Sequence, residues 1–292
     1  MLEHPSSTAQ DGQVARVSFQ DVFDALEHVD DPDVLEKAKG NSALWHALEL
    51  SRPKNWRGTG IKPEAILAVA RESGIPVAWI PPPDVLRRLA SAASADRMAV
   101  IRSHAAEIIV QCDQLLGECR DNWLGDDRIL VGRAIEALKA GHHEAAMALA
   151  VDVGEALALW ASVPHVLMFD SEEEKDAWAK MHGRNKYKLA ETELAAVGSQ
   201  RELKRVEILR HALIAPIPKF FTPFYARPQE VIPATVSRHA TVHKPTIKHL
   251  SSDNALIAIM LCVSILREQQ AWCARVHDEE AFAEEVSSWD LS

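Results

Sequence analysis

One short stretch of the sequence places an arginine and two histidines close together. Arg238 and His239 are adjacent, and His243 follows directly before Lys244. Histidine exchanges protons near neutral pH, because its unperturbed pKa is about 6.5. Arginine carries a permanent charge on a planar group that matches the oxygens of a phosphate. The stretch is therefore a candidate active site for proton transfer beside a bound phosphate.

The spacing alone is a weak signal. With 13 histidines in 292 residues, an arginine followed five positions later by a histidine is expected about once by chance. Requiring Asn, Asp or His directly after the arginine lowers that expectation roughly tenfold, and His239 meets the requirement. A second interpretation stays open, in which these polar residues only solvate or cap the start of the next helix.

The stretch resembles the R-x4-6-H motif of the HEPN superfamily, in which Asn, Asp or His follows the arginine. Arg238, His239 and His243 fill these positions, and residues 253–267 look like the long apolar helix that follows the motif in such proteins. The resemblance covers about residues 95–275. Outside the motif it is a resemblance of helical pattern and not of residue identity.

The resemblance implies an all-α fold with an antiparallel helical bundle, and a metal-independent endoribonuclease without a cofactor. In such an enzyme the RNA 2′-hydroxyl attacks the neighbouring phosphate. His243 would be the general acid/base, Arg238 would bind the phosphate, and His239 would support them. Toxin, antiviral-defence and RNA-processing roles are typical of the superfamily, as is a homodimer with two facing motifs. A neutralising or activating protein partner is also typical.

Basic residues near the motif are candidates for further RNA contacts. Residues 201–250 contain nine Lys or Arg and three acidic residues, whereas the rest of the chain contains 23 and 39. This block suggests a local phosphate-binding region in an otherwise acidic protein, with Lys244, Lys248 and Arg227 as substrate-binding candidates. The alternative function is a helical RNA-binding or protein-interaction module without catalysis.

Composition predicts an ordinary globular protein, with 47% hydrophobic and 25% charged residues. The N-terminus lacks the basic and apolar regions of a secretory signal, and the apolar run 255–266 is too short for a bilayer, so we expect a cytoplasmic protein. The four cysteines form no C-x-x-C pair and lie in helical patterns. We therefore expect reduced core cysteines and no metal site.

The N-terminal part is predicted to be a disordered tail over residues 1–16 and a mostly helical region over 17–90. Pro63 and Gly74 frame a helix at 64–73, and the apolar segment 75–80 reads as extended. The basic loop 51–60 carries Trp56, which we expect to be a packing anchor more than a nucleic-acid contact. The prolines 81–83 break the chain and mark a domain boundary between them and residue 95.

The second part, residues 95–276, is predicted to hold the bundle. Apolar spacing indicates a helix over 98–119, one over 128–140 ending at Gly141, and one beginning at His142 and His143. Further helices are expected from residue 201 and over 252–276, with a short helix or tail over 277–292. Capping boxes begin at Ser171 and Ser199.

A proline-rich loop over 216–233 precedes the motif. Its aromatic residues could pack the loop on the bundle or stack with RNA bases, and we favour packing; they are Phe220, Phe221, Phe224 and Tyr225. A loop of this length in a compact domain is usually functional. It could therefore hold Arg238 in place.

Overall fold

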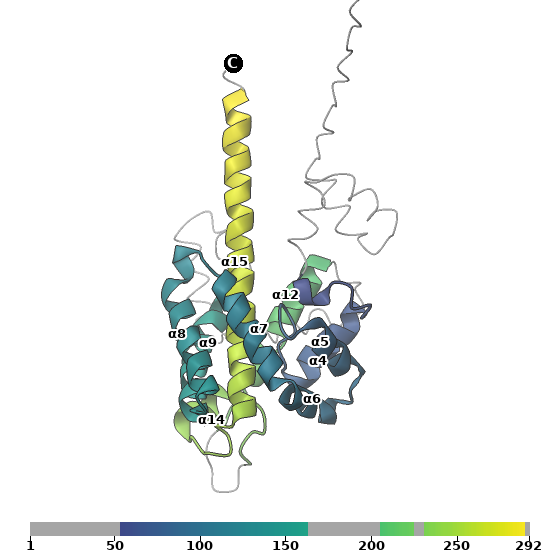
Figure 1. The fold of residues 1–292 in the computed structure, drawn as a ribbon, viewed down its shortest axis with the longest axis vertical. Helices are drawn as coiled ribbons and strands as arrows, with labels where there is room; N and C mark the ends of the chain where they lie inside the picture. The colour runs from purple at the N-terminus through teal and green to yellow at the C-terminus, as the bar shows by residue number, and fades with distance from the viewer. Residues whose placement is uncertain (1–52, 163–204, 225–230, 290–292) are drawn as a thin grey trace, which may run out of the picture. The chain divides into compact units, whose positions relative to one another are not determined.

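The computed structural model describes residues 53–162, 205–224 and 231–289 (Figure 1). These residues form helices and no strand, which confirms the predicted all-α class. Contacts divide the chain into two units, 1–51 and 52–292, and all described residues belong to the second. The predicted capping boxes, the tail over 1–16, Tyr225 and Arg227 lie outside the described residues.

The first helices of this unit are short. The 3-10 helix η1 spans Lys54–Trp56, α4 spans Pro63–Ser73, α5 spans Pro83–Ser91 and the 3-10 helix η2 spans Ser94–Asp96. Helix α4 begins at Pro63 and ends at Gly74, whose φ of 68° is the left-handed conformation of a C-terminal cap, as predicted. Helix α5 was not predicted. Its leading proline, which we read as a break, occupies the first helical position, where no amide hydrogen is needed.

The apolar segment 75–80 is buried and has no regular secondary structure. Side chains from other elements bind its carbonyl groups: Asn55 Nδ2 donates to Val77 O (2.9 Å), and Trp56 Nε1 donates to the same oxygen (2.8 Å). Gln111 Nε2 donates to Trp79 O at 3.2 Å. Side chains thus supply the hydrogen bonds to the carbonyl groups of this segment that a neighbouring strand would supply in a sheet.

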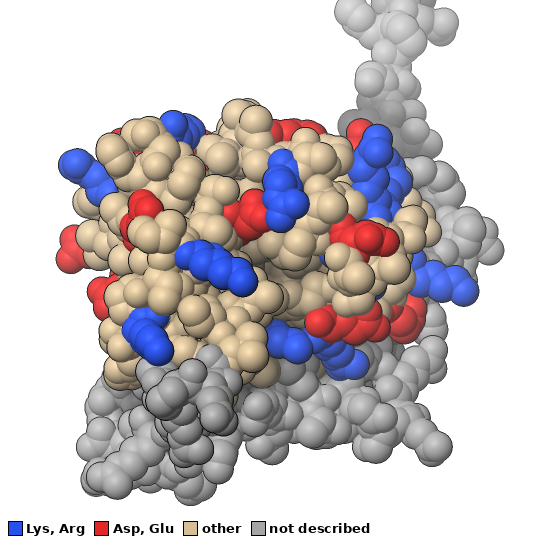
Figure 2. Space-filling model, turned by 90° about the horizontal axis from the view of Figure 1, so that it is seen from below, with Lys and Arg blue, Asp and Glu red and all other residues tan. Residues whose placement is uncertain are grey.

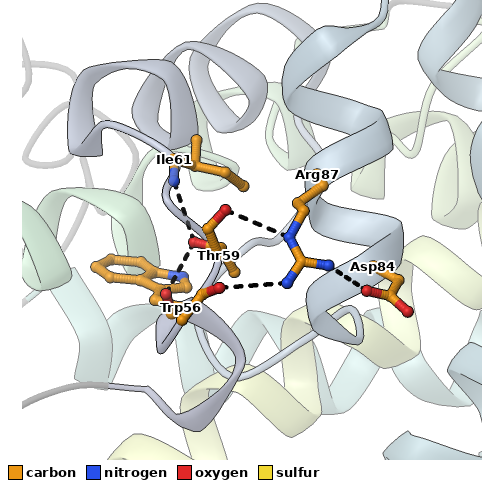
Figure 3. Close-up of polar contacts among 6 residues, drawn as sticks. Trp56, Thr59, Ile61, Asp84 and Arg87 are labelled. Atoms are coloured by element: carbon orange, nitrogen blue, oxygen red, sulfur yellow. Dashed lines mark hydrogen bonds and ion pairs between the residues drawn. The ribbon is translucent and has the colours of Figure 1, made fainter.

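The loop after η1 is fixed by helix α5 (Figure 3). Arg87 Nε donates to Thr59 O at 3.3 Å, and the Arg87 guanidinium also pairs with Asp84. Thr59 Oγ1 donates to Trp56 O at 2.8 Å. Trp56 packs against the hydrophobic core, so its predicted role as a packing anchor is confirmed.

The helix predicted over 98–119 is interrupted. The structure has α6 over Arg97–Ser103 and α7 over Ala105–Glu118, and His104 between them leaves helical geometry with φ −116° and ψ 15°. The His104 ring nitrogen Nδ1 lies 2.9 Å from Val100 O, the carbonyl four residues earlier. The Ser103 hydroxyl donates to the same oxygen at 2.9 Å, and a side chain that bonds this carbonyl competes with the backbone amide.

Two later helices form a hairpin. The 3-10 helix η3 spans Asn122–Leu124 and leads into α8, Gly125–Lys139, and then into α9, His143–Ser162. Gly141 has φ 82° between α8 and α9, in agreement with the predicted stop, and α9 begins at one of the two histidines expected there. The short link makes α8 and α9 antiparallel neighbours, and they pack together.

Helix α15, Ser252–Trp289, packs against α9, α7 and α8 (Figure 1). The helix predicted over 252–276 thus continues without a break through residues 277–289, which were predicted to be a separate short helix or tail. These residues contain no Gly or Pro that would end the helix. Helices α6 and α7 run in the same direction as α15, because two contacts follow the same order along both. Arg102 forms an ion pair with Asp253, and further along Arg120 N donates to Gln270 Oε1 at 2.7 Å.

The remaining helices are α12, Arg205–Ile214, α13, Ile217–Phe220, and α14, Arg238–His243. In the proline-rich loop Phe220, Phe221 and Phe224 are buried, which confirms packing for these three rings. All four cysteines are buried thiols, as expected. No helix in the three described ranges is both long enough and apolar enough to cross a membrane.

Candidate active site

The motif forms the short helix α14. Ser237 precedes it in extended conformation, and its hydroxyl accepts a hydrogen bond from Ala240 N at 3.2 Å. The same hydroxyl donates to Thr222 O at 3.0 Å, just after α13. Ser237 is therefore an N-cap that also ties the motif to the aromatic part of the proline-rich loop. The motif was expected just before the long helix, and it lies there, with residues 244–251 between α14 and α15; that the motif itself is helical was not predicted.

His249 anchors this segment from inside the protein. It is 1% exposed, and its Nδ1 lies 3.1 Å from Pro233 O while its Nε2 lies 3.2 Å from Ser237 O. The ring nitrogen that carries the proton donates to its carbonyl, and the other nitrogen packs beside its own. Its backbone oxygen accepts from Asn254 Nδ2 at 2.9 Å, at the start of α15. One buried ring thus connects the proline-rich loop, the motif helix and α15, and so fixes the backbone of α14.

Arg238 points from α14 to helix α9. Its Nε donates to Glu155 Oε2 at 2.9 Å, and the two side chains are 25% and 31% exposed. Because a carboxylate accepts a charge-assisted bond from a guanidinium, this contact fixes the direction of the arginine. Glu155 was missed by the sequence analysis. One feature of the sequence could have pointed to it: Glu155 is an acidic residue within an otherwise apolar stretch of α9, in which Val153 and Leu157 are buried.

The two histidines of α14 lie beside each other. The centroids of the His239 and His243 rings are 5.7 Å apart, with an angle of 43° between the ring planes. A spacing of four residues places both rings on one face of a helix. Arg238 and His243 are five residues apart, which rotates them by about 140° around the helix axis. One copy of α14 therefore brings the histidines together and directs the arginine elsewhere.

The environment favours the neutral form of His239. Burial lowers its pKa, and the positive charges of Arg238 and His243 lower it further, against a smaller opposite effect of Glu155. A neutral imidazole at neutral pH can accept a proton. His243 is exposed and in contact with solvent. The pair thus combines a ring that is ready to accept a proton with a second ring open to a substrate.

The two lysines proposed as substrate contacts lie next to this cluster. Lys244 ends α14 and Lys248 follows in the turn, and both are exposed. Among the described residues, no hydrogen bond or ion pair joins either lysine to Arg238 or to the histidines. Exposed apolar side chains accompany them, since Val242 is 54% and Ile247 is 76% exposed.

The surface seen from below in Figure 1 carries mixed charge. Figure 2 shows Lys and Arg side chains on this face as separate groups, with Asp and Glu between them. The visible part of this face forms no broad basic surface. Attraction of a phosphate would therefore depend on the few cations next to α14 and not on a general positive field.

Two other kinds of site fit the described residues less well. Burial raises the pKa of the Cys119 thiol to about 11 and also raises the pKa values of the Cys112 and Cys262 thiols, so these three are unsuited to act as thiolate nucleophiles. A small hollow lies beside Lys219 and Asn254. Neither Arg238 nor a histidine of the motif lines it.

The cluster on α9 and α14 therefore offers one fixed cation and two neighbouring imidazoles at a partly exposed surface. Such a set can bind a phosphate oxygen and move protons on the atoms bonded to it. It is held in place by Ser237 and His249, which come from the chain on either side. In comparisons with known proteins, no family model, no curated protein and no solved structure matches the chain.

Proposed function

We propose that the chain is a metal-independent endoribonuclease whose active site is the α14 cluster. The observation that carries the proposal is the pairing of His239 with His243, whose rings are 5.7 Å apart, next to a half-buried arginine. Cleavage of RNA by its own 2′-hydroxyl requires one proton acceptor, one proton donor and a cation for the phosphate. His239 and His243 would supply the two groups for proton transfer, and Arg238 of the same copy or of a second copy would supply the cation.

In the proposed reaction, one imidazole accepts the proton of the 2′-hydroxyl as the 2′-oxygen bonds to phosphorus. The bond from phosphorus to the 5′-oxygen breaks, and that oxygen takes a proton from the other imidazole. The products are a 2′,3′-cyclic phosphate and a 5′-hydroxyl. The lowered pKa of His239 favours this residue as the acceptor, and the exposed His243 is then the donor. His239 thereby acts directly in the reaction, beyond a supporting role.

Arg238 stabilises the charge that develops on the phosphate oxygens. Its Nε is engaged by Glu155, so the terminal amino groups are the part that would meet the substrate. Lys244, Lys248 and Arg227 would bind neighbouring phosphates of the RNA, and binding should therefore weaken as the salt concentration rises. The cellular role would be in defence, as a toxin, or in RNA processing.

We further propose that two copies of the chain assemble with their motifs facing. Support comes from the rotation of about 140° between Arg238 and His243 on one helix, because an arginine from a second copy could complete the site. The exposed Val242 lies within the motif and the exposed Ile247 lies just after it, and both are suited to such an interface. A mixture of Arg238→Ala and His243→Ala should then recover cleavage that neither variant shows alone.

The alternative function is an RNA-binding or protein-interaction module without catalysis. The observation that favours it is the ion pair of Arg238 with Glu155, which already occupies part of the guanidinium. Such a module would bind RNA and leave it intact. A non-catalytic role would also make the two histidines individually replaceable.

The test of the proposal is incubation of the full chain with total RNA in EDTA, followed by gel electrophoresis. We expect fragments from the wild type, and none from His243→Ala or His239→Ala. A suitable control is His142→Ala, because His142 is exposed and precedes Glu155 by 13 positions, about 20 Å along α9. Saturable binding of RNA that stays intact with the wild type would favour the alternative.

A further inference from the structure

Glu155 stands out on α9 as an acidic side chain among buried apolar neighbours. We infer that Glu155 is a positioning residue of the proposed ribonuclease site. It accepts a hydrogen bond from Arg238 Nε, and this contact directs the terminal amino groups of the arginine toward the phosphate. The inference rests on the proposed function, which names Arg238 as the phosphate ligand. It adds a residue outside the motif, on a different helix, to the site.

The geometry of the contact supports this role. A guanidinium has five N–H groups, and Glu155 accepts from the one on Nε, at 2.9 Å. The four N–H groups on the terminal nitrogens remain, and in the described part of the chain no other group accepts from them. These four form the edge that binds two phosphate oxygens at once. Contact at Nε therefore orients the arginine without using this edge.

The surroundings of Glu155 indicate that the arginine is held from a fixed point. Val153, Gly154 and Leu157 are buried, so the backbone of α9 is packed on both sides of Glu155. The carboxylate is itself only 31% exposed. By comparison, Arg102 in the pair with Asp253 is 65% exposed and can rearrange in solvent. A guanidinium that is fixed before substrate arrives needs less reorganisation during the reaction.

Glu155 also acts on His239. The charges near the His239 ring are those of Arg238 and His243 on α14 and of Glu155 on α9. The first two lower the pKa of His239, and Glu155 raises it. Among the described residues, Glu155 carries the one charge that favours the protonated ring, and replacement with the neutral glutamine removes it. The pKa of His239 should then fall further, which reports that the Glu155 charge lies close to the ring.

A competing role for the ion pair makes the opposite prediction. If Glu155 withheld Arg238 from the substrate, the pair would be an inhibitory latch, and its removal would free the arginine. Cleavage would then become faster. The sign of the change in rate thus distinguishes positioning from inhibition.

The first experiment compares Glu155→Gln with the wild type in cleavage of the same RNA. We expect kcat/KM to fall about 10-fold to 100-fold, since a displacement of about 1 Å in a catalytic group has effects of this size. The acidic limb of the pH profile should move to lower pH. Asp152→Asn is the matched control, because it removes the same charge from an exposed position on α9 and should change neither quantity. Equal or faster cleavage by Glu155→Gln would overturn the inference.

The second experiment needs no RNA and so separates the inference from the proposed function. The titration of the His239 ring is followed by NMR in the wild type, Glu155→Gln and Asp152→Asn. We expect a lower midpoint in Glu155→Gln alone. An unchanged midpoint would contradict the coupling of Glu155 to the site. A lowered midpoint in a chain that leaves RNA intact would confirm that Glu155 acts on His239 and would refute the ribonuclease.

Discussion

His249 offers the sharpest test of how the motif is held, because it is buried at 1% exposure while His243, six positions earlier, is exposed. Replacing His249 with Ala removes the ring that joins Pro233 to Ser237. Ser237 O keeps the hydroxyl of Thr241 as a donor at 2.9 Å. Pro233 O loses the ring nitrogen that lies 3.1 Å from it.

The expected loss of stability has two parts. An acceptor left without its partner in a partly buried position costs about 1–2 kcal/mol. The space left by the imidazole adds about 2 kcal/mol, as for other truncations of buried side chains. The free energy of unfolding should therefore fall by about 3 kcal/mol. For a unit of this size the midpoint of thermal unfolding should fall by about 6–12 °C.

Circular dichroism during heating and during urea titration measures both quantities. His243→Ala is the matched control, since exposed substitutions usually change stability by less than about 0.5 kcal/mol. We expect His249→Ala to unfold earlier and His243→Ala to unfold like the wild type. If His249→Ala lost less than about 1 kcal/mol, the buried ring would not be the anchor that the hydrogen bonds indicate.

Three further predictions concern single positions. Gly74→Ala should lower stability by about 1–2 kcal/mol in urea unfolding, because Gly74 has φ 68° and an added Cβ would lie 2.9 Å from Lys219 Cβ; an unchanged midpoint would contradict this. Ser237→Ala should cost about 1–2 kcal/mol and slow RNA cleavage, since the cap of α14 is lost; cleavage at the wild-type rate would show that the cap does not matter to the site. The acidic limb of the pH profile should lie below the ordinary histidine value of 6.5, because a lowered pKa keeps His239 neutral to lower pH; a limb above 6.5 would exclude His239 as the proton acceptor.

Local signals in the sequence identified several elements of the fold. Helix α4 is marked at both ends, by Pro63 at its start and Gly74 at its end, and the structure agrees with both. The hairpin of α8 and α9 was likewise visible from Gly141. Helix α5 was missed because a proline at a helix start and a proline that breaks a chain look alike in sequence. Only the burial of Val85, Leu86 and Leu89 separates the two.

Other features depend on contacts that sequence spacing does not encode. At the break by His104, the side chains of Ser103 and His104 both turn toward the carbonyl of Val100. The pairing of Arg238 with Glu155 joins residues 83 positions apart, and no local pattern relates them. His249 reads as one more polar residue after the motif, although it is the buried centre of the segment. The candidate residues of the motif were visible in sequence, but their support was not.

One measurement tests directly whether the α14 histidines cleave RNA through its 2′-hydroxyl, as we propose. An RNA that the wild type cleaves is remade with 2′-deoxyribose at the cleaved position, and both substrates are incubated in EDTA with the wild type and with His243→Ala. We predict that the wild type cleaves the unmodified RNA and leaves a 2′,3′-cyclic phosphate end. We predict no cleavage of the deoxy-substituted RNA by either protein, and none of the unmodified RNA by His243→Ala. Cleavage of the deoxy-substituted substrate, or undiminished cleavage by His243→Ala, would contradict the proposal.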